Sequence, residues 1–242
     1  MYHRRGIIAR SPIILIVAVC LLATGCSLEY TRAGIEFVPQ AGDLLFQDLD
    51  GSPFCEAIEK VTKGYKGANL THVGIVANDA DGNIVVLEAL IKGVSVTPLN
   101  EFLARSHDRK QRPKVLVGRL KPKYRHLIQP VLEEVLTLKG KPYDKIFDIQ
   151  NDAYYCSEVI YHGFLKARGG KPLFELQPMT FVDPDTGETF PAWKEYFAEL
   201  AVAIPEGKPG INPGGISRSH TLSIIYAYGT PSNRERSKRR TR

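Results

Sequence analysis

The chain has 242 residues, 43% of them hydrophobic, which is enough for one domain with a substantial core. Its formal net charge is +6, but residues 1–25 carry +3 and residues 234–242 carry +5, and subtracting both leaves −2 for residues 26–233. Because the basic charge lies at the two ends rather than on the folded part, we expect no nucleic-acid partner. No feature of the composition indicates an oligomeric state.

The first 25 residues have the pattern of a secretory signal peptide. Arg4, Arg5 and Arg10 precede an apolar run at residues 13–23, which is too short to span a bilayer comfortably. The run ends in LLATGC, which resembles the bacterial lipobox, although the leucine of that motif lies one place further back here. Ordinary signal cleavage and an uncleaved anchor are the alternatives.

The lipobox resemblance implies cleavage before Cys26 and acylation of its thiol and its amine. Several acyl chains together give lasting membrane attachment. Ser27 follows the cysteine, which by analogy with enteric lipoprotein sorting implies the outer membrane, facing the periplasm. We therefore expect a lipid-anchored protein of the bacterial cell envelope, with Cys26 as its attachment to the membrane.

Downstream of the anchor, residues 26–40 are expected to be a linker and residues 41–204 a folded domain. Residues 205–233 are expected to form a C-terminal extension, because their first part is rich in Pro and Gly. Residues 234–242 are predicted to be a solvated basic tail, and contact with anionic lipid or an envelope polymer is an alternative role for it.

Hydrophobic periodicity and turn residues predict the elements of the domain in chain order. A strand at 42–49 and a helix at 52–62 come first, and a hairpin with strands at 71–77 and 84–90 turns at Asp81-Gly82. Further strands are predicted at 94–99, 114–120 and 221–229, and further helices at 100–105, 126–138, 156–168 and 191–200. The strands cluster and the helices flank them, which is typical of an α+β fold.

Two of the four cysteines are left for the mature domain, because Cys20 lies in the signal peptide and Cys26 is the expected lipidation site. There is no CxxC and no Cys/His cluster at zinc spacing, so we expect no metal and no cofactor. Cys55 lies within a predicted helix, where a small buried apolar role is expected. A disulfide between Cys55 and Cys156 is the alternative, because the envelope is oxidising.

Cys156 lies at the predicted start of a helix, in the stretch AYYCSEVIYHGF. A helix N-terminus stabilises a thiolate, and its free N–H groups can bind an oxyanion. His162 lies six residues further along the same helix, on a different side, so it cannot serve as the base. His72 begins an apolar strand, and Glu88 lies within the next strand across the hairpin turn, so the two form a candidate base and orienting acid.

The motifs GDLLFQ, THVGIV, VLEA, VSVTPL, GKPYD and YYCSEV follow one another in this order. Together they resemble the YiiX/YaeF group of permuted papain-like cysteine hydrolases, relatives of the NlpC cell-wall hydrolases, over residues 41–165. The resemblance implies an antiparallel sheet or small barrel packed against the cysteine-bearing helix. It also implies Cys156 as nucleophile, His72 as base and Glu88 as orienting acid. Asp43, Tyr143 and Tyr155 fall in the motifs, with structural or substrate-side roles.

We therefore expect an envelope-anchored cysteine hydrolase that cleaves an amide bond, of peptide or cell-wall type, through an acyl-enzyme. A hydrolase or transferase of acyl lipids on the same fold is one alternative. A non-catalytic lipoprotein that binds an envelope ligand is the other, and in it Cys156 could be tied to Cys55. The number of free thiols distinguishes the enzyme from the disulfide-bonded form.

Overall fold

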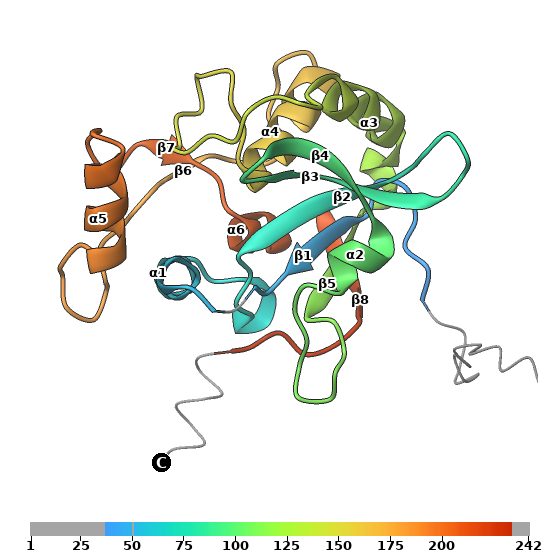
Figure 1. Ribbon diagram of the computed structural model, residues 1–242. Helices are drawn as coiled ribbons and strands as arrows, with labels where there is room; N and C mark the ends of the chain where they lie inside the picture. The colour runs from blue at the N-terminus through green and yellow to red at the C-terminus, as the bar shows by residue number, and fades with distance from the viewer. Residues whose placement is uncertain (1–36, 50, 234–242) are drawn as a thin grey trace, which may run out of the picture. The chain divides into compact units, whose positions relative to one another are not determined.

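The computed structural model describes residues 37–49 and 51–233, and its centre is a six-stranded antiparallel sheet (Figure 1). The strands lie side by side in the order β4-β3-β2-β1-β5-β8. Their bounds are β1 Leu44–Gln47, β2 His72–Asn78, β3 Ile84–Leu90, β4 Gly93–Pro98, β5 Val115–Leu120 and β8 Leu222–Ala227. The predicted hairpin is the β2–β3 pair, in which Ile75 lies opposite Leu87.

The helices follow the predicted positions closely. Their bounds are α1 Pro53–Val61, α2 Leu99–Leu103, α3 Ile128–Thr137, α4 Cys156–Ala167 and α5 Pro191–Glu199. The predicted helix at 126–138 is divided between a 3₁₀ segment, η2 Pro122–Leu127, and α3. Pro130 lies in the first turn of α3, where its missing N–H costs no helical hydrogen bond. The α+β class is therefore confirmed.

Local sequence explains where the helices begin and end. The Ser52 hydroxyl accepts a hydrogen bond from the Cys55 N–H at the start of α1, and Pro53 occupies the first helical position. The helix α4 ends before Gly169 and Gly170, whose φ angles of 62° and 85° are left-handed.

The region at 205–233, predicted as a C-terminal extension, contributes β8 to the main sheet beside β5. It also holds two short elements that the sequence did not predict, β7 Pro209–Gly210 and α6 Pro213–Ser217. The strand that pairs with β7, β6 Gln177–Pro178, lies outside this region and was not predicted either. A further 3₁₀ turn, η1 Tyr65–Gly67, was also not predicted. Elements of two to five residues are too short to show a hydrophobic period.

Each face of the sheet has its own apolar core. The helices α3 and α4 pack together over one face, where Val73, Ile75 and Leu87 meet Val159 and Phe164 (Figure 1). The short helix α2 covers part of the other face, with Phe102 placed against strand residues such as Val76 and Val86. A separate aromatic cluster joins α1 to α5 through Phe54, Trp193 and Phe197.

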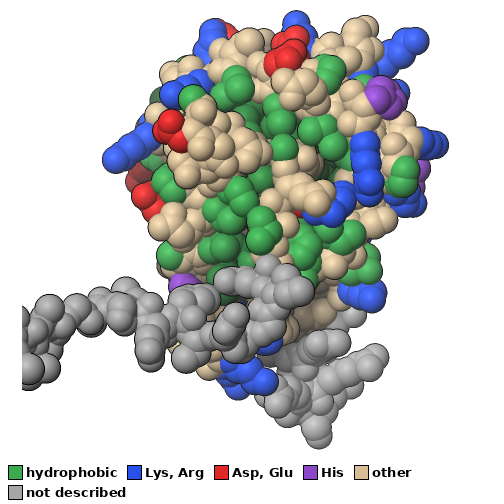
Figure 2. Space-filling view, turned by 90° about the vertical axis from the view of Figure 1, so that its right-hand side faces the viewer, with side chains coloured by type: hydrophobic (Ala, Val, Ile, Leu, Met, Phe, Trp, Pro, Cys, Tyr) green, Lys and Arg blue, Asp and Glu red, His purple; other side chains and the backbone are tan. Residues whose placement is uncertain are grey.

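Figure 2 views the side of the molecule on which α2 and the β2–β3 hairpin lie in Figure 1. Hydrophobic side chains gather in the middle of this side, and Lys and Arg side chains lie mostly towards its edges. Among residues 37–49 and 51–233, no helix is long and apolar enough to cross a membrane. The predicted signal peptide, Cys26, most of the linker and the basic tail lie outside the described residues.

Gly74 allows β2 and β3 to approach closely beside the predicted site. A Cβ atom at this position would lie 2.4 Å from Val86 Cγ1 and 3.3 Å from Glu88 Cβ. The absence of a side chain at Gly74 therefore leaves room for the Glu88 side chain on the neighbouring strand.

We predict that Gly74→Ala lowers the free energy of unfolding by about 1–3 kcal/mol, because the added methyl group overpacks the sheet. Urea unfolding measures the change. Gly215→Ala is the control, since its new Cβ would meet no atom closer than 3.4 Å and alanine is the better helix former. A Gly74→Ala protein as stable as the wild type would contradict the predicted steric role.

Candidate active site

Cys156 is the first residue of α4 and is 7% exposed. The helix packs on the face of the sheet that carries Val73. The Cys156 sulfur also accepts a hydrogen bond from the Val73 N–H, so the N-terminus of the helix lies at the beginning of β2. N–H groups in the first turn of a helix have no partner within the helix, and the helix dipole adds partial positive charge there. The backbone thus places the Cys156 thiol in a position that favours its anion.

His72 is the first residue of β2, and Glu88 lies within β3, so the hairpin holds both on adjacent strands. The His72 Nε2 atom lies 2.5 Å from Glu88 Oε2. Both residues are buried, at 5% and 0% exposed. Because Nε2 is engaged by Glu88, Nδ1 is the ring nitrogen that is available to Cys156.

Cys156 and His72 change each other's protonation. Burial by itself would raise the pKa of Cys156, but hydrogen bonding to His72, and then attraction to the charged ring, lower that pKa below the ordinary thiol value. Burial would likewise lower the pKa of His72, and hydrogen bonds to Cys156 and Glu88 raise it to about 9. The arrangement therefore favours a thiolate and an imidazolium near neutral pH.

Glu88 is kept ionised although it is fully buried. Burial would raise its pKa, but hydrogen bonds from Arg105, His72 and Thr97 lower the pKa to about 2. Sequence reasoning missed Arg105 and Thr97. Thr97 follows Glu88 in the next predicted strand, which was a weak signal, whereas Arg105 lies beyond a short helix, and its sequence position gave no signal.

Asp43 does not lie with the other predicted site residues. In the β1–β2 register Gln47 lies opposite His72, so Asp43, four residues before Gln47, is at the far end of the strand pair. Its carboxylate accepts two hydrogen bonds from Arg119, each 2.7 Å long. Its role in the structure is to tie the start of β1 to β5.

The two predicted tyrosines lie near Cys156. Burial raises the pKa of Tyr143, and the nearby Cys156 thiolate raises it further, so the phenol stays protonated. Tyr155 immediately precedes α4, and its hydroxyl accepts a 3.0 Å hydrogen bond from the Ile211 N–H. Tyr155 thus fixes the segment before α6 against the start of α4. Tyr143 lies close enough to Cys156 for the thiolate to affect its pKa.

A buried carboxyl group at Glu158 was also missed. It lies in the first turn of α4 and is 0% exposed, and its Oε2 accepts a 2.9 Å hydrogen bond from the Tyr155 N–H. Burial raises the pKa of Glu158 to about 9, and the nearby Asp144 and Cys156 contribute in the same direction. A neutral Glu158 avoids placing a second negative charge beside the Cys156 thiolate.

Both cysteines in the described residues are free thiols, so the disulfide alternative from the sequence is wrong for this structure. Cys55 is only partly buried, in contrast to the small buried apolar role predicted for it. Its sulfur accepts a 3.2 Å hydrogen bond from the Ser52 hydroxyl, at the surface end of α1. His162 packs edge-on against Tyr154 and Tyr161 rather than facing the nucleophile.

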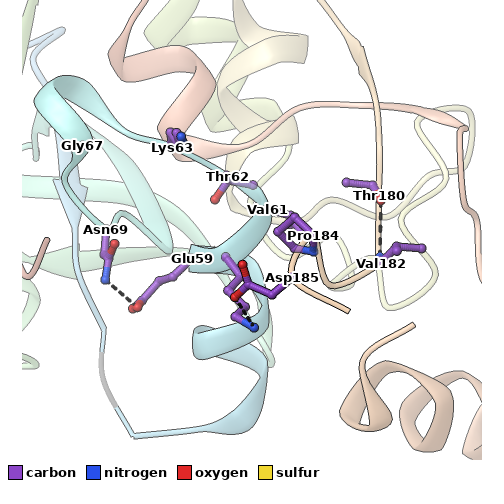
Figure 3. Close-up of a pocket in the computed structure, with 11 residues that line it drawn as sticks. Glu59, Val61, Thr62, Lys63, Gly67, Asn69, Thr180, Val182, Pro184 and Asp185 are labelled. Carbon is purple, nitrogen blue, oxygen red and sulfur yellow. Dashed lines mark hydrogen bonds and ion pairs between the residues drawn. The ribbon is translucent and has the colours of Figure 1, made fainter. Parts of the chain in front are cut away.

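A groove of about 640 Å³ lies between the second half of α1, the segment before β2 and the loop at 180–185 (Figure 3). In this view Asn69 is joined to Glu59. Lys60, which also lines the groove, pairs with Asp185 at 3.1 Å. Cys156, His72 and Glu88 are not among its lining residues. The chemistry of the side chains, rather than the size of this groove, therefore identifies the candidate active site.

We predict that Cys156 reacts with iodoacetamide at pH 6, where an ordinary thiol with a pKa near ~8.5 is almost fully protonated. In His72→Ala the thiolate loses the hydrogen bond and the positive charge of the ring, while burial still raises the pKa of the thiol, so the rate at pH 6 should fall by about 100-fold or more. Peptide mass spectrometry reads each cysteine separately, and Cys55 in the same sample is the internal reference. Equal pH profiles for Cys156 in the two proteins would contradict the pairing with His72.

Two comparisons show known proteins to which this chain is similar. The chain is 29% identical to the uncharacterized protein YiiX of Escherichia coli (strain K12) over 199 residues, which cover 82% of this chain and 92% of that protein. It is also similar in fold to a crystal structure of yiiX from Escherichia coli O157:H7, with a TM-score of 0.65 and 24% identity. That match covers 79% of this chain and 98% of the other.

The yiiX protein of Escherichia coli O157:H7 is described as a metalloprotein. In the part of this chain that the structure describes, no three His, Cys, Asp or Glu side chains are arranged to hold a metal ion. The His72 ring is moreover already engaged by Glu88 and Cys156. The described residues therefore do not fit a metal centre.

A third comparison covers most of the domain. The sequence model of a family described as permuted papain-like amidases, YaeF/YiiX, C92 family, matches residues 38–226. The match includes the cysteine-bearing helix α4 and the main sheet from β1 to all but the last residue of β8. The chain therefore belongs to the YaeF/YiiX family of permuted papain-like amidases.

Proposed function

We propose that the protein is a cysteine amidase that cleaves a peptide-type amide bond through an acyl-enzyme on Cys156. The observation that carries the proposal is the chain of contacts from Cys156 to His72 to Glu88 at the start of a helix. This arrangement supplies a nucleophile, a proton carrier and an orienting carboxylate, which are the three groups that acyl transfer requires. Membership of an amidase family supports the bond type.

In the first half of the reaction, the Cys156 thiolate attacks the carbonyl carbon of the amide and forms a tetrahedral intermediate. The N–H groups at the start of α4 stabilise the negative oxygen of this intermediate. His72 then donates the proton on Nδ1 to the leaving nitrogen, and the C–N bond breaks. The amine departs and a thioester to Cys156 remains.

In the second half, neutral His72 takes a proton from a water molecule, which attacks the thioester carbonyl. The second tetrahedral intermediate collapses, the carboxylic acid leaves, and the thiolate and imidazolium are restored. Glu88 holds the ring in one orientation throughout, because its hydrogen bond to Nε2 is made in both halves. Each step involves only groups of the protein, the substrate and water.

We predict that the purified full-length chain releases an amine and an acid from a peptide amide substrate, with muropeptides as the first set tested. Acyl-lipid esters form the competing set, because a thioester intermediate serves both bond types. Products are identified by mass. Cys156→Ser should lose at least about 10³-fold in kcat while keeping its fold. Cys55→Ser, the matched control, should retain wild-type activity.

Turnover of esters alone would replace the amidase assignment with an acyl-lipid hydrolase. Release by Cys156→Ser at the wild-type rate would contradict the cysteine mechanism altogether. Ligand binding without turnover would favour the non-catalytic lipoprotein.

The second part of the proposal is the place where the enzyme acts. The signal-like N-terminus and the Gly25-Cys26 junction support attachment to the envelope by acyl chains on Cys26, at the periplasmic side of the outer membrane. A linker from residue 26 to residue 40 would then separate the site from the bilayer surface. A cell-wall peptide or an acyl lipid would be within reach of an enzyme held there.

We predict that Cys26→Ser releases the protein from the membrane fraction or blocks its processing, because the acylated thiol is lost. Cell fractionation measures the release, and the mass of the N-terminal peptide shows the acyl chains directly. Cys20→Ser is the control, since that residue would be removed with the signal peptide. An unmodified soluble form of the wild type would contradict the anchor.

A further inference from the structure

Glu88 accepts four hydrogen bonds, two on each carboxylate oxygen. Oε2 is 2.5 Å from His72 Nε2 and 2.7 Å from Arg105 Nη1. Oε1 is 2.5 Å from Thr97 Oγ1 and 2.5 Å from Arg105 Nη2. Arg105 therefore grips the carboxylate with both arms of its guanidinium, and the planar fork matches the two oxygens. This two-point pairing fixes the plane of the carboxylate and also stabilises its negative charge.

Arg105 has a second contact besides Glu88, with the ring of Phe102. It follows α2 in a turn, and its guanidinium carbon lies 5.2 Å from the centre of the Phe102 ring. The Phe102 ring is fully buried and lies 5.8 Å from the His72 ring, and the Phe102 carbonyl accepts a 2.8 Å hydrogen bond from Gln47. Arg105 thus packs on the face of the sheet that α2 covers, and 23% of its side chain is exposed.

The direction of the His72–Glu88 hydrogen bond follows from this grip. A carboxylate that stays ionised can only accept hydrogen bonds, so His72 must carry a proton on Nε2. A glutamate free to rotate or to take up a proton could instead donate to the ring, and the Nδ1 position would then change its role. With Arg105, Glu88, imidazolium and thiolate present, the charges of the buried cluster sum to zero.

We propose that Arg105 is a positioning residue, whose guanidinium, together with the Thr97 hydroxyl, fixes the Glu88 carboxylate so that the proton of His72 stays on Nε2 and Nδ1 faces Cys156. The inference rests on the proposed function, since it assigns Arg105 to the same site. Arg105 acts through Glu88 and His72 and does not touch the reacting atoms. The consequence is that the pH range of thiolate formation depends on a residue that is two contacts away from the nucleophile.

The test compares Arg105→Gln and Arg105→Lys with the wild type in the full-length chain. Lysine keeps the charge but cannot make the two parallel hydrogen bonds, so both variants lose the grip. We expect both to shift the pH midpoint of Cys156 alkylation upward by about one unit or more. We also expect kcat to fall by about 100-fold with little change in KM, because misplacing a catalytic group acts on the chemical step.

Arg112→Gln is the matched control, because it removes another arginine that pairs with a carboxylate but does not contact Glu88. Arg112 pairs with Asp108 at 2.8 Å and is 47% exposed, and this variant should leave alkylation and turnover unchanged. Thr97→Val removes one donor at nearly constant volume and should shift the midpoint in the same direction by a smaller amount. If the Arg105 variants do not fold, as judged by circular dichroism, Thr97→Val decides the proposal by itself.

Alkylation needs no substrate, so this readout is separate from the proposed activity. A wild-type midpoint equal to that of a free thiol would contradict the proposed function itself. A low wild-type midpoint that stays unchanged in folded Arg105→Gln and Arg105→Lys would overturn the role of Arg105 alone. Loss of stability with an unchanged midpoint would also overturn it, because a merely structural arginine would behave in that way.

Discussion

The candidate site depends on one buried carboxylate, that of Glu88. An ionised carboxyl group with no exposed surface is costly unless its oxygens are fully hydrogen-bonded, and removing one partner of such a group costs about 3–5 kcal/mol. Here the sheet supplies His72 and Thr97 from the two flanking strands, and the turn after α2 supplies Arg105. The carboxylate therefore links three segments of the chain and fixes the orientation of the His72 ring.

The same arrangement explains how the sheet and the helix cooperate. His72 and Glu88 belong to the face of the sheet that α2 covers, whereas Cys156 begins a helix that packs on the opposite face. Cys156 meets His72 at the beginning of β2, where the chain passes from the Leu70–Thr71 segment into the strand. The site is thus at the end of a strand, where a side chain can be reached from either layer of the structure.

Charge around the start of α4 is balanced in a similar way. The helix N-terminus and the imidazolium favour the Cys156 thiolate. Asp144 and Glu158 are both fully buried nearby, and two charged carboxylates would oppose that thiolate. Asp144 accepts hydrogen bonds from the backbone N–H groups of Ile146 and Asp148, while burial raises the pKa of Glu158 to about 9. The backbone thus satisfies the oxygens of Asp144, and burial favours the neutral form of Glu158.

The sequence alone determined the α+β class, the hairpin across Asp81-Gly82 and the start of α4 at Cys156, because these features follow from local periodicity, turn residues and caps. It also placed His72 and Glu88 side by side, since a two-strand register is a short-range property. Only the tertiary structure decided the remaining partners. Arg105 reaches Glu88 across 17 positions of sequence, and Asp43 pairs with Arg119 across 76. Such contacts depend on how strands and turns pack in the folded protein. A side-chain pair between distant segments produces no hydrophobic period or turn motif in the sequence from which it could be predicted.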